Sequence, residues 1–229
     1  MKKKLTVKEI LESKGKKKLT QVYVHTPLEA NACEKSEIDM IISSENNNFK
    51  FLRDNAKNTF FTVGLQYGRY LSEYEIIKKS FQLLELGADA IYCPQSARFI
   101  KAIANEGIPV VGHAGFIPYK LTQYGGFKAY GKNFEEAKKI LNEINVLQDA
   151  GAFATEIEIV PEEIVEIIYK ETDIFLIGMG SGAICDAQYL FSEDILGYNN
   201  GHIPRHAKTY ANLNKNFEDI QAKSIQAYK

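Results

Sequence analysis

The regular alternation of short β-prone runs with amphipathic helical stretches constrains the fold of this chain more than any other feature of its sequence. Strands that alternate with helices form a parallel sheet. Eight such units in 229 residues predict a (β/α)8 TIM barrel, a single α/β domain spanning residues 1–229. The β-prone runs are Gln21–His25, Ile38–Ser44, Thr59–Leu65, Ala90–Cys93, Pro109–His113, Ala154–Ile159, Phe175–Met179 and Gln188–Phe191.

Start and stop signals support the helices between these runs. Ser72–Glu75 has the pattern of a capping box, and Asn133–Glu136 is similar. Ser96 is a suitable N-cap for a helix that Gly107 can close in a left-handed conformation. Pro161 suits the first position of the helix after the sixth run.

Two further helices are expected at the ends of the chain. Leu5–Ser13 would form a short helix over the bottom of the barrel, and Asn214–Tyr228 would form a polar terminal helix. Neither a glycine-rich dinucleotide fingerprint after an early strand nor a P-loop is present in the sequence.

Composition and charge exclude several classes of function. A formal net charge of -1 gives no support for a nucleic-acid partner or an anionic membrane. No apolar run is long enough to span a bilayer, and no apolar segment follows the basic N-terminus as in a signal peptide. The chain has 3 cysteines without close pairing, which suits a reducing compartment. A cytoplasmic protein is therefore expected.

Glu158 is the leading candidate for chemistry. It closes the sixth β-prone run, between Ile157 and Ile159, and Pro161 follows. In an α/β barrel the carboxyl end of a strand is where side chains leave the core and meet substrate. A carboxylate at this place is a candidate general base. The alternative is a carboxylate that caps the next helix or pairs with a lysine.

Other strand ends would face the same mouth of the barrel. His113 is flanked by glycines, which let the backbone approach a ligand; the alternative is a buried histidine satisfied by one backbone carbonyl. The amides of Gly178–Gly182 are suited to a carboxylate or phosphate, although any tight turn after a strand favours the same residues. The expected strand-end positions are Glu45, Gly64, Pro94, His113, Glu158 and Gly180.

Several stretches, in one order over nearly the whole chain, resemble the ketopantoate hydroxymethyltransferase family, also called 3-methyl-2-oxobutanoate hydroxymethyltransferase. The most specific are the histidine–glycine–proline stretch and the glycine–cysteine–aspartate–glutamine stretch. The matching segments are Thr6–Leu11, Lys16–Thr20, Ile38–Ile41, Gly107–Pro118, Tyr124–Lys132, Ala150–Ala154, Glu158–Pro161, Ile177–Gly182, Cys185–Gln188, Asp194–Gly197 and Lys208–Leu213.

The resemblance implies a (β/α)8 barrel that forms homo-oligomers and acts in pantothenate biosynthesis. In the family a divalent metal, such as Mg²⁺, chelates a small 2-oxo acid and polarises its carbonyl. A base removes a proton beside the carbonyl, and the enolate attacks the one-carbon unit of methylenetetrahydrofolate. The family's base falls on Glu158 and its active-site histidine on His113.

The metal half of the site departs from the family pattern. The family's first metal motif, Gly-Asp-Ser, reads Ser44–Asn46 here, and its second acidic ligand aligns with Gly64. The lysine and glutamate that end the family's fourth strand align with Tyr92 and Pro94. Glu45 alone would remain as a metal ligand. The expected substrate-binding residues are Ser44, Glu45, Asn46, Tyr92, Gly180 and Ser181.

Three hypotheses follow from this half-retained site. The first is a diverged enzyme that makes or breaks a carbon–carbon bond beside the carbonyl of an oxo acid, with a lyase or aldolase as one form. The second is the unaltered hydroxymethyl transfer. The third is a non-catalytic paralogue that binds a metabolite or assembles with a true family member.

Overall fold

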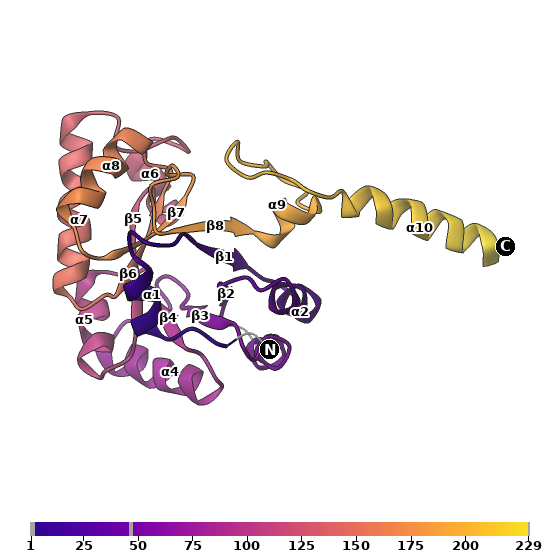
Figure 1. The fold of residues 1–229 in the computed structure, drawn as a ribbon, viewed down its shortest axis with the longest axis horizontal. Helices are drawn as coiled ribbons and strands as arrows, with labels where there is room; N and C mark the ends of the chain where they lie inside the picture. Colours follow the sequence, from indigo (N-terminus) through magenta and orange to yellow (C-terminus); the bar gives the residue numbers. More distant parts are fainter. Residues whose placement is uncertain (1–2, 46–47, 229) are drawn as a thin grey trace.

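The computed structural model describes residues 3–45 and 48–228 and shows a closed barrel of eight parallel strands, ordered β1 to β8 (Figure 1). This confirms the predicted TIM barrel. Every strand falls within two residues of a predicted run at each end. The strands are β1 (Leu19–Tyr23), β2 (Met40–Ser44), β3 (Phe60–Gly64), β4 (Ala90–Tyr92), β5 (Val110–Gly115), β6 (Ala154–Glu158), β7 (Phe175–Met179) and β8 (Ala187–Phe191).

Helices lie outside the strands, in most of the connections between them and also before the first strand and after the last (Figure 1). They are α1 (Val7–Ser13), α2 (Pro27–Lys35), α3 (Phe49–Asp54), α4 (Glu73–Glu85), α5 (Ala97–Asn105), α6 (Leu121–Tyr124), α7 (Phe134–Asp149), α8 (Glu162–Glu171), α9 (Ser192–Leu196) and α10 (Leu213–Tyr228), with a 3₁₀ turn at Pro118–Lys120. Among the described residues, no helix has the length and apolarity needed to cross a membrane.

The predicted helix signals are largely confirmed. Ser72 and Glu75 form a reciprocal capping box at α4, and the side chain of Asn133 caps α7. Ser96 occupies the N-cap of α5, but no hydrogen bond from its side chain caps the helix. The prediction for Pro161 is wrong by one residue, because its ψ of 138° is extended and α8 begins at Glu162.

Side-chain alternation along the strands divides the core into two layers. One buried cluster fills the barrel interior and is contributed by residues such as Met40, Phe60 and Phe175. Ile10 of α1 belongs to this cluster, so α1 covers the barrel bottom as predicted. The larger cluster lies between the strands and the outer helices and includes Ile157. Glu156 and Glu158, on either side of Ile157 in β6, therefore point inward.

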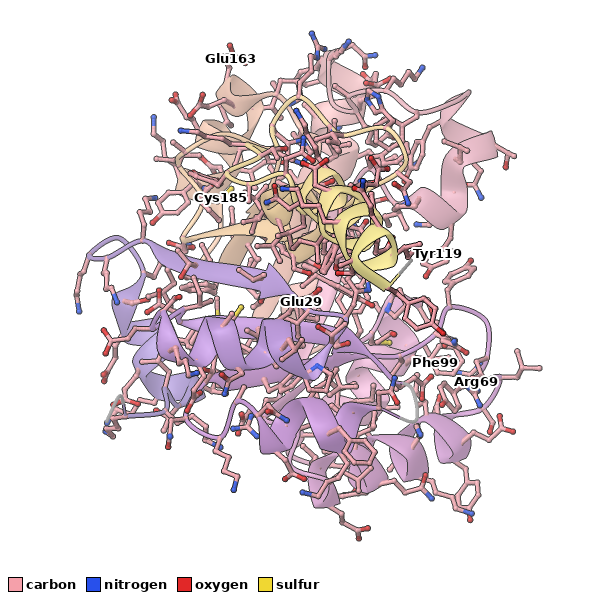
Figure 2. The ribbon with its side chains drawn as sticks, turned by 90° about the vertical axis from the view of Figure 1, so that its right-hand side faces the viewer. Glu29, Arg69, Phe99, Tyr119, Glu163 and Cys185 are labelled. Atoms are coloured by element: carbon pink, nitrogen blue, oxygen red, sulfur yellow. The ribbon has the colours of Figure 1, made fainter. Side chains whose placement is uncertain are left out.

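The segment after β8 is tied to the barrel through α2. Glu29 on α2 (labelled in Figure 2) accepts hydrogen bonds from Ser192 Oγ at 2.9 Å and Tyr198 Oη at 2.6 Å. Beyond this anchor α10 projects away from the barrel (Figure 1) and buries none of its residues. Its exposed apolar side chains include Phe217 and Ile225.

Candidate active site

A cavity of about 410 Å³ opens at the carboxyl ends of the strands. Six strand-end positions were expected from the sequence to share this mouth, and Gly64, His113 and Glu158 do line it. Pro94 lines a separate hollow beside α5 and α7, and Gly180 lines a second cavity. The lining residues of the first cavity are Tyr23, His25, Ile42, Ser43, Ser44, Gly64, Leu65, Gln66, Tyr92, His113, Pro118, Tyr119, Glu156, Glu158, Met179, Tyr189 and Phe191.

The expected position of Glu45 is corrected by the structure. Met40 and Ile42 point into the barrel, so alternation sends Ser44 to the cavity and Glu45 to the outer face. The buried Glu45 carboxylate accepts hydrogen bonds from the Gln66 amide at 3.0 Å and from the Tyr70 hydroxyl. Lys79 of α4 pairs with it at 3.5 Å. Its partners therefore hold Glu45 behind the strand.

The inward-facing ends of β2, β3 and β4 do not suit a hard divalent cation. Mg²⁺ favours oxygen ligands that include one or two carboxylates. The ends of β2, β3 and β4 present Ser44, Gly64 and Tyr92 to the cavity, none of which is acidic. Across residues 3–45 and 48–228, no group of three or more histidine, cysteine or acidic side chains has a metal-binding arrangement. Asn46, expected to bind substrate, lies outside the described residues.

Glu158 and His113 meet at the centre of the mouth. Adjacent strands β5 and β6 bring His113 Nε2 to 3.2 Å from Glu158 Oε2. Nε2 also lies 3.1 Å from the carbonyl of Phe116, and Nδ1 lies 2.6 Å from the hydroxyl of Tyr92. Burial lowers the pKa of His113, but the hydrogen bond and charge of Glu158 outweigh it and raise that pKa above its usual value. The single-carbonyl alternative for His113 therefore does not hold.

The backbone around Glu158 is locally strained. Ile159 has a φ of 49°, a left-handed conformation that β-branched residues rarely adopt. The Ile159 amide donates to the carbonyl of Met179 at 2.8 Å, and the Tyr130 amide donates to the carbonyl of Ile159 at 3.0 Å. Gly115, with a φ of 83°, passes so close that an added Cβ would lie 2.7 Å from the Glu158 carbonyl. These contacts fix the turn that presents Glu158 to the cavity. The N-cap of α8 is Pro161 and not Glu158, and no side-chain hydrogen bond from the N-cap residue caps this helix.

Glu156 belongs to the site but was not predicted. It is 3% exposed and lies one layer below Glu158, with Oε2 at 3.9 Å from His113 Nδ1 and Oε1 accepting from Gln21 Nε2 at 3.3 Å. Burial raises its pKa to about 7, although the charge of His113 opposes this. The signal in the sequence is its spacing of two residues from Glu158, because such residues share one face of a strand.

The turn after β7 supports the site from behind. Ser181 is 1% exposed; its hydroxyl donates to the carbonyl of Ile157 at 2.8 Å and accepts from the amide of Val160 at 3.1 Å. These bonds join the turn after β7 to the turn beyond Glu158, and the described lining of the first cavity does not include Ser181. The substrate contact of Ser181 stays a prediction. Gly180 has a φ of 63°, and the ring of His206 lies so close that a Cβ there would meet it at 2.5 Å.

A second cavity of about 490 Å³ adjoins the mouth and is strongly basic. Ile159 and Gly180, which directly follow the first cavity's Glu158 and Met179, form part of its wall. Lys128, Lys132 and Arg205 supply positive charge, and the described lining contains no aspartate or glutamate. The remaining lining residues are Phe127, Ala129, His202, Pro204 and His206. Its chemistry favours an anionic ligand.

Comparison with solved structures supports the fold. The carboxyl transferase domain of Rhizobium etli pyruvate carboxylase with pyruvate matches with a TM-score of 0.62 at 10% identity, covering 82% of this chain and 42% of that one. A 2,3-dimethylmalate lyase of the PEP mutase/isocitrate lyase superfamily matches with a TM-score of 0.58 at 10% identity, covering 82% and 81%. At these identities the likeness concerns the barrel alone.

Sequence comparison places the chain more narrowly. The 3-methyl-2-oxobutanoate hydroxymethyltransferase of Kosmotoga olearia is 31% identical over 98% of this chain and 93% of its own length. The enzyme of that name from Thermosipho africanus is 32% identical over 98% and 92%. The sequence model of ketopantoate hydroxymethyltransferase matches residues 46–229. The chain therefore belongs to the ketopantoate hydroxymethyltransferase family.

Proposed function

We propose that this protein is an enzyme that transfers a hydroxymethyl group to a small 2-oxo acid through an enolate. The observation that carries this proposal is the approach of Glu158 to His113, 3.2 Å apart in a cavity of about 410 Å³. Relatives named for this transfer with 3-methyl-2-oxobutanoate support the reaction class. The apolar part of the lining, with Ile42, Met179 and Phe191, suits a short aliphatic side chain.

The first chemical step is proton abstraction. Glu158 removes a proton from the carbon beside the carbonyl, and the electron pair of that C–H bond moves to form the enolate, with negative charge on the former carbonyl oxygen. Tyr92 lines the same cavity, and its hydroxyl lies 2.6 Å from His113 Nδ1. We assign Tyr92 to hydrogen-bond the enolate oxygen, in the manner of an oxyanion hole. No step runs through a metal, because the inward strand ends do not suit one.

The second step forms the carbon–carbon bond. The enolate carbon attacks the one-carbon unit of methylenetetrahydrofolate, the co-substrate that family membership suggests. The two carbon–nitrogen bonds of that unit break, and water supplies the hydroxyl of the product. Tetrahydrofolate leaves after its two nitrogens have taken one proton from that water and one from Glu158. We place the acidic end of this donor in the second cavity, where Lys128, Lys132 and Arg205 gather without acidic neighbours. The two cavities adjoin at β6 and β7, so donor and acceptor would meet over Glu158.

The setting of the reaction is also a proposal. Cys33, Cys93 and Cys185 are buried and form no disulfide in the described part of the chain, which supports a cytoplasmic location. The exposed apolar side chains on the projecting α10 support a homo-oligomer. Pantothenate biosynthesis is the process that the family's reaction would serve.

The decisive experiment has two readouts on the purified protein. Deuterium exchange beside the carbonyl is followed by NMR across a panel of short 2-oxo acids, and hydroxymethyl product is then measured with methylenetetrahydrofolate added. Exchange and product are both expected with 3-methyl-2-oxobutanoate. Exchange without product would assign a different carbon–carbon bond reaction, and stoichiometric binding without exchange would indicate a metabolite-binding paralogue.

Arg205→Ala tests the basic cavity. Losing one charge-assisted hydrogen bond to the donor is expected to raise the donor's KM about tenfold. Exchange without donor should stay at the wild-type rate, because the guanidinium lies outside the first cavity. Lys101→Ala, an exposed substitution on α5, is the charge-matched control. An equal change in both variants, or a loss of exchange in Arg205→Ala, would remove the donor from this cavity.

A further inference from the structure

We infer that Glu156 is a positioning residue that keeps both ring nitrogens of His113 protonated, so that the Tyr92 hydroxyl is free to donate into the cavity. The inference deepens the proposed function, and it rests on that function only for the identity of the oxygen that receives the Tyr92 hydrogen bond. The claim about His113 stands on the arrangement of side chains inside the barrel.

Burial is the first observation. Glu156 is 3% exposed, in the barrel interior above apolar residues such as Ala154 and Phe175. A carboxylate here costs desolvation that an apolar side chain of similar size would avoid. Gln21 donates one hydrogen bond to it, and in the described part of the chain no lysine or arginine pairs with it. The basic group that Glu156 faces is His113.

The groups around His113 define its possible proton positions. Glu156 and Glu158 project from β6, Tyr92 from β4 and Tyr189 from β8, all lining the cavity. Nε2 faces the Glu158 carboxylate and the Phe116 carbonyl, both acceptors, so this nitrogen carries a proton. Only Nδ1, which faces Tyr92 and Glu156, can be with or without a proton.

The state of Nδ1 decides where the Tyr92 proton points. With a bare Nδ1, the Tyr92 hydroxyl donates to the ring across the 2.6 Å contact and is used up there. With a protonated Nδ1, the ring donates to the Tyr92 oxygen, and the hydroxyl proton turns toward the cavity. The Glu156 carboxylate, which is ionised from about pH 7 upwards, has Oε2 3.9 Å from Nδ1 and stabilises this second state by its charge.

This arrangement supplies the positive charge that the enolate needs. The described lining of the first cavity contains no lysine or arginine. An imidazolium at His113, between Glu156 and Glu158, places a fixed cation behind the Tyr92 hydroxyl and strengthens its hydrogen bond to a developing oxyanion. The ends of β2, β3 and β4 present no acidic residue to the cavity, whereas β6 presents Glu156 in addition to Glu158.

The direct test is an NMR titration of ring-labelled histidine in wild type and Glu156→Gln. The protein has 4 histidines, and a His113→Gln spectrum assigns the resonance of interest. The His113 midpoint is expected to fall by about one pH unit or more in Glu156→Gln, since an opposite charge at this range shifts a pKa by one to three units. The other midpoints should not move, nor should any in the exposed control Glu163→Gln.

A second arm tests the link to Tyr92 through exchange rates. Tyr92→Phe is expected to slow exchange about 100-fold, as loss of one oxyanion donor does. If Glu156 acts through that hydroxyl, Glu156→Gln should slow exchange in wild type and add little in Tyr92→Phe. An unmoved His113 midpoint in a folded Glu156→Gln protein, or fully additive losses, would overturn the inference. If the wild type shows no exchange but the His113 midpoint still falls in Glu156→Gln, the inference about His113 stands and the proposed function is rejected.

Discussion

Glu158→Gln is expected to slow deuterium exchange beside the carbonyl of 3-methyl-2-oxobutanoate by between about 100-fold and 10,000-fold, the usual contribution of a general base. The amide has the size of the carboxylate but cannot accept the proton. The hydrogen bonds of Ile159 and the close approach of Gly115 to position 158 involve no atom of the Glu158 side chain, so the fold around position 158 should persist. Exchange is measured by NMR at saturating oxo acid, and binding of the acid is measured separately.

Glu163→Gln is the matched control for this substitution. Glu163 lies on α8, five residues further along the chain, and points away from the barrel into solvent (Figure 2). The substitution Glu163→Gln removes one negative charge from the same region as Glu158→Gln does. The change in net charge is therefore equal in the two variants, but the cavity is untouched in Glu163→Gln. Wild-type exchange in both variants would exclude Glu158 as the base. Equal losses in both would trace the defect to charge or folding.

The barrel could be predicted because its signal is periodic and repeated. The strands of the parallel sheet are covered on both faces and most of them read as short apolar runs, and several connections carry helix-capping residues such as Ser72 and Asn133. Errors at single boundaries, such as Pro161, do not change such a pattern. The family motifs around His113 and Glu158 located the half of the site that the structure then brings together.

The direction of Glu45 could not be predicted for the same reason. In a strand buried on both faces, inward and outward residues are equally apolar, so Met40–Ile42 give no phase for the alternation. A shift of one residue exchanges the two faces. The phase is set by tertiary packing, which sends Ser44 inward and gives Glu45 the partners Tyr70 and Lys79.

Glu156 was missed although its sequence signal was present. Once Glu158 is taken to face the mouth, a residue two positions earlier in the strand must face the interior. A charge in a barrel interior is costly, so local propensity argues against that reading, and only the position of His113 on the neighbouring strand supplies the partner. The pairing of β5 with β6 in register, which aligns His113 with Glu156, is not visible in the sequence.

The cost of burying Glu156 should appear as a pH-dependent difference in stability between wild type and Glu156→Gln. Its pKa is about 7 in the folded protein, against an ordinary value of 4.5. A raised folded pKa means that the folded state holds the proton more tightly. The stabilising contribution of Glu156 is therefore complete below about pH 4.5 and is lost as the pH rises through about 7. Across that window the difference amounts to at most about 3 kcal/mol.

The difference between the two proteins is the diagnostic quantity. Glu29 and Glu34 have lowered pKa values, because the hydrogen bonds they accept outweigh the cost of burial, and they destabilise wild type and variant equally in acid. The free energy of unfolding of each protein is measured in urea from pH 5 to pH 8.5. Subtracting one from the other cancels the contributions of Glu29 and Glu34. Glu156→Gln should gain stability relative to wild type as the pH rises, since the variant has no carboxylate to ionise at position 156. A constant difference would mean that Glu156 ionises as easily in the folded chain as in the unfolded one, and that its surroundings tolerate the charge without cost.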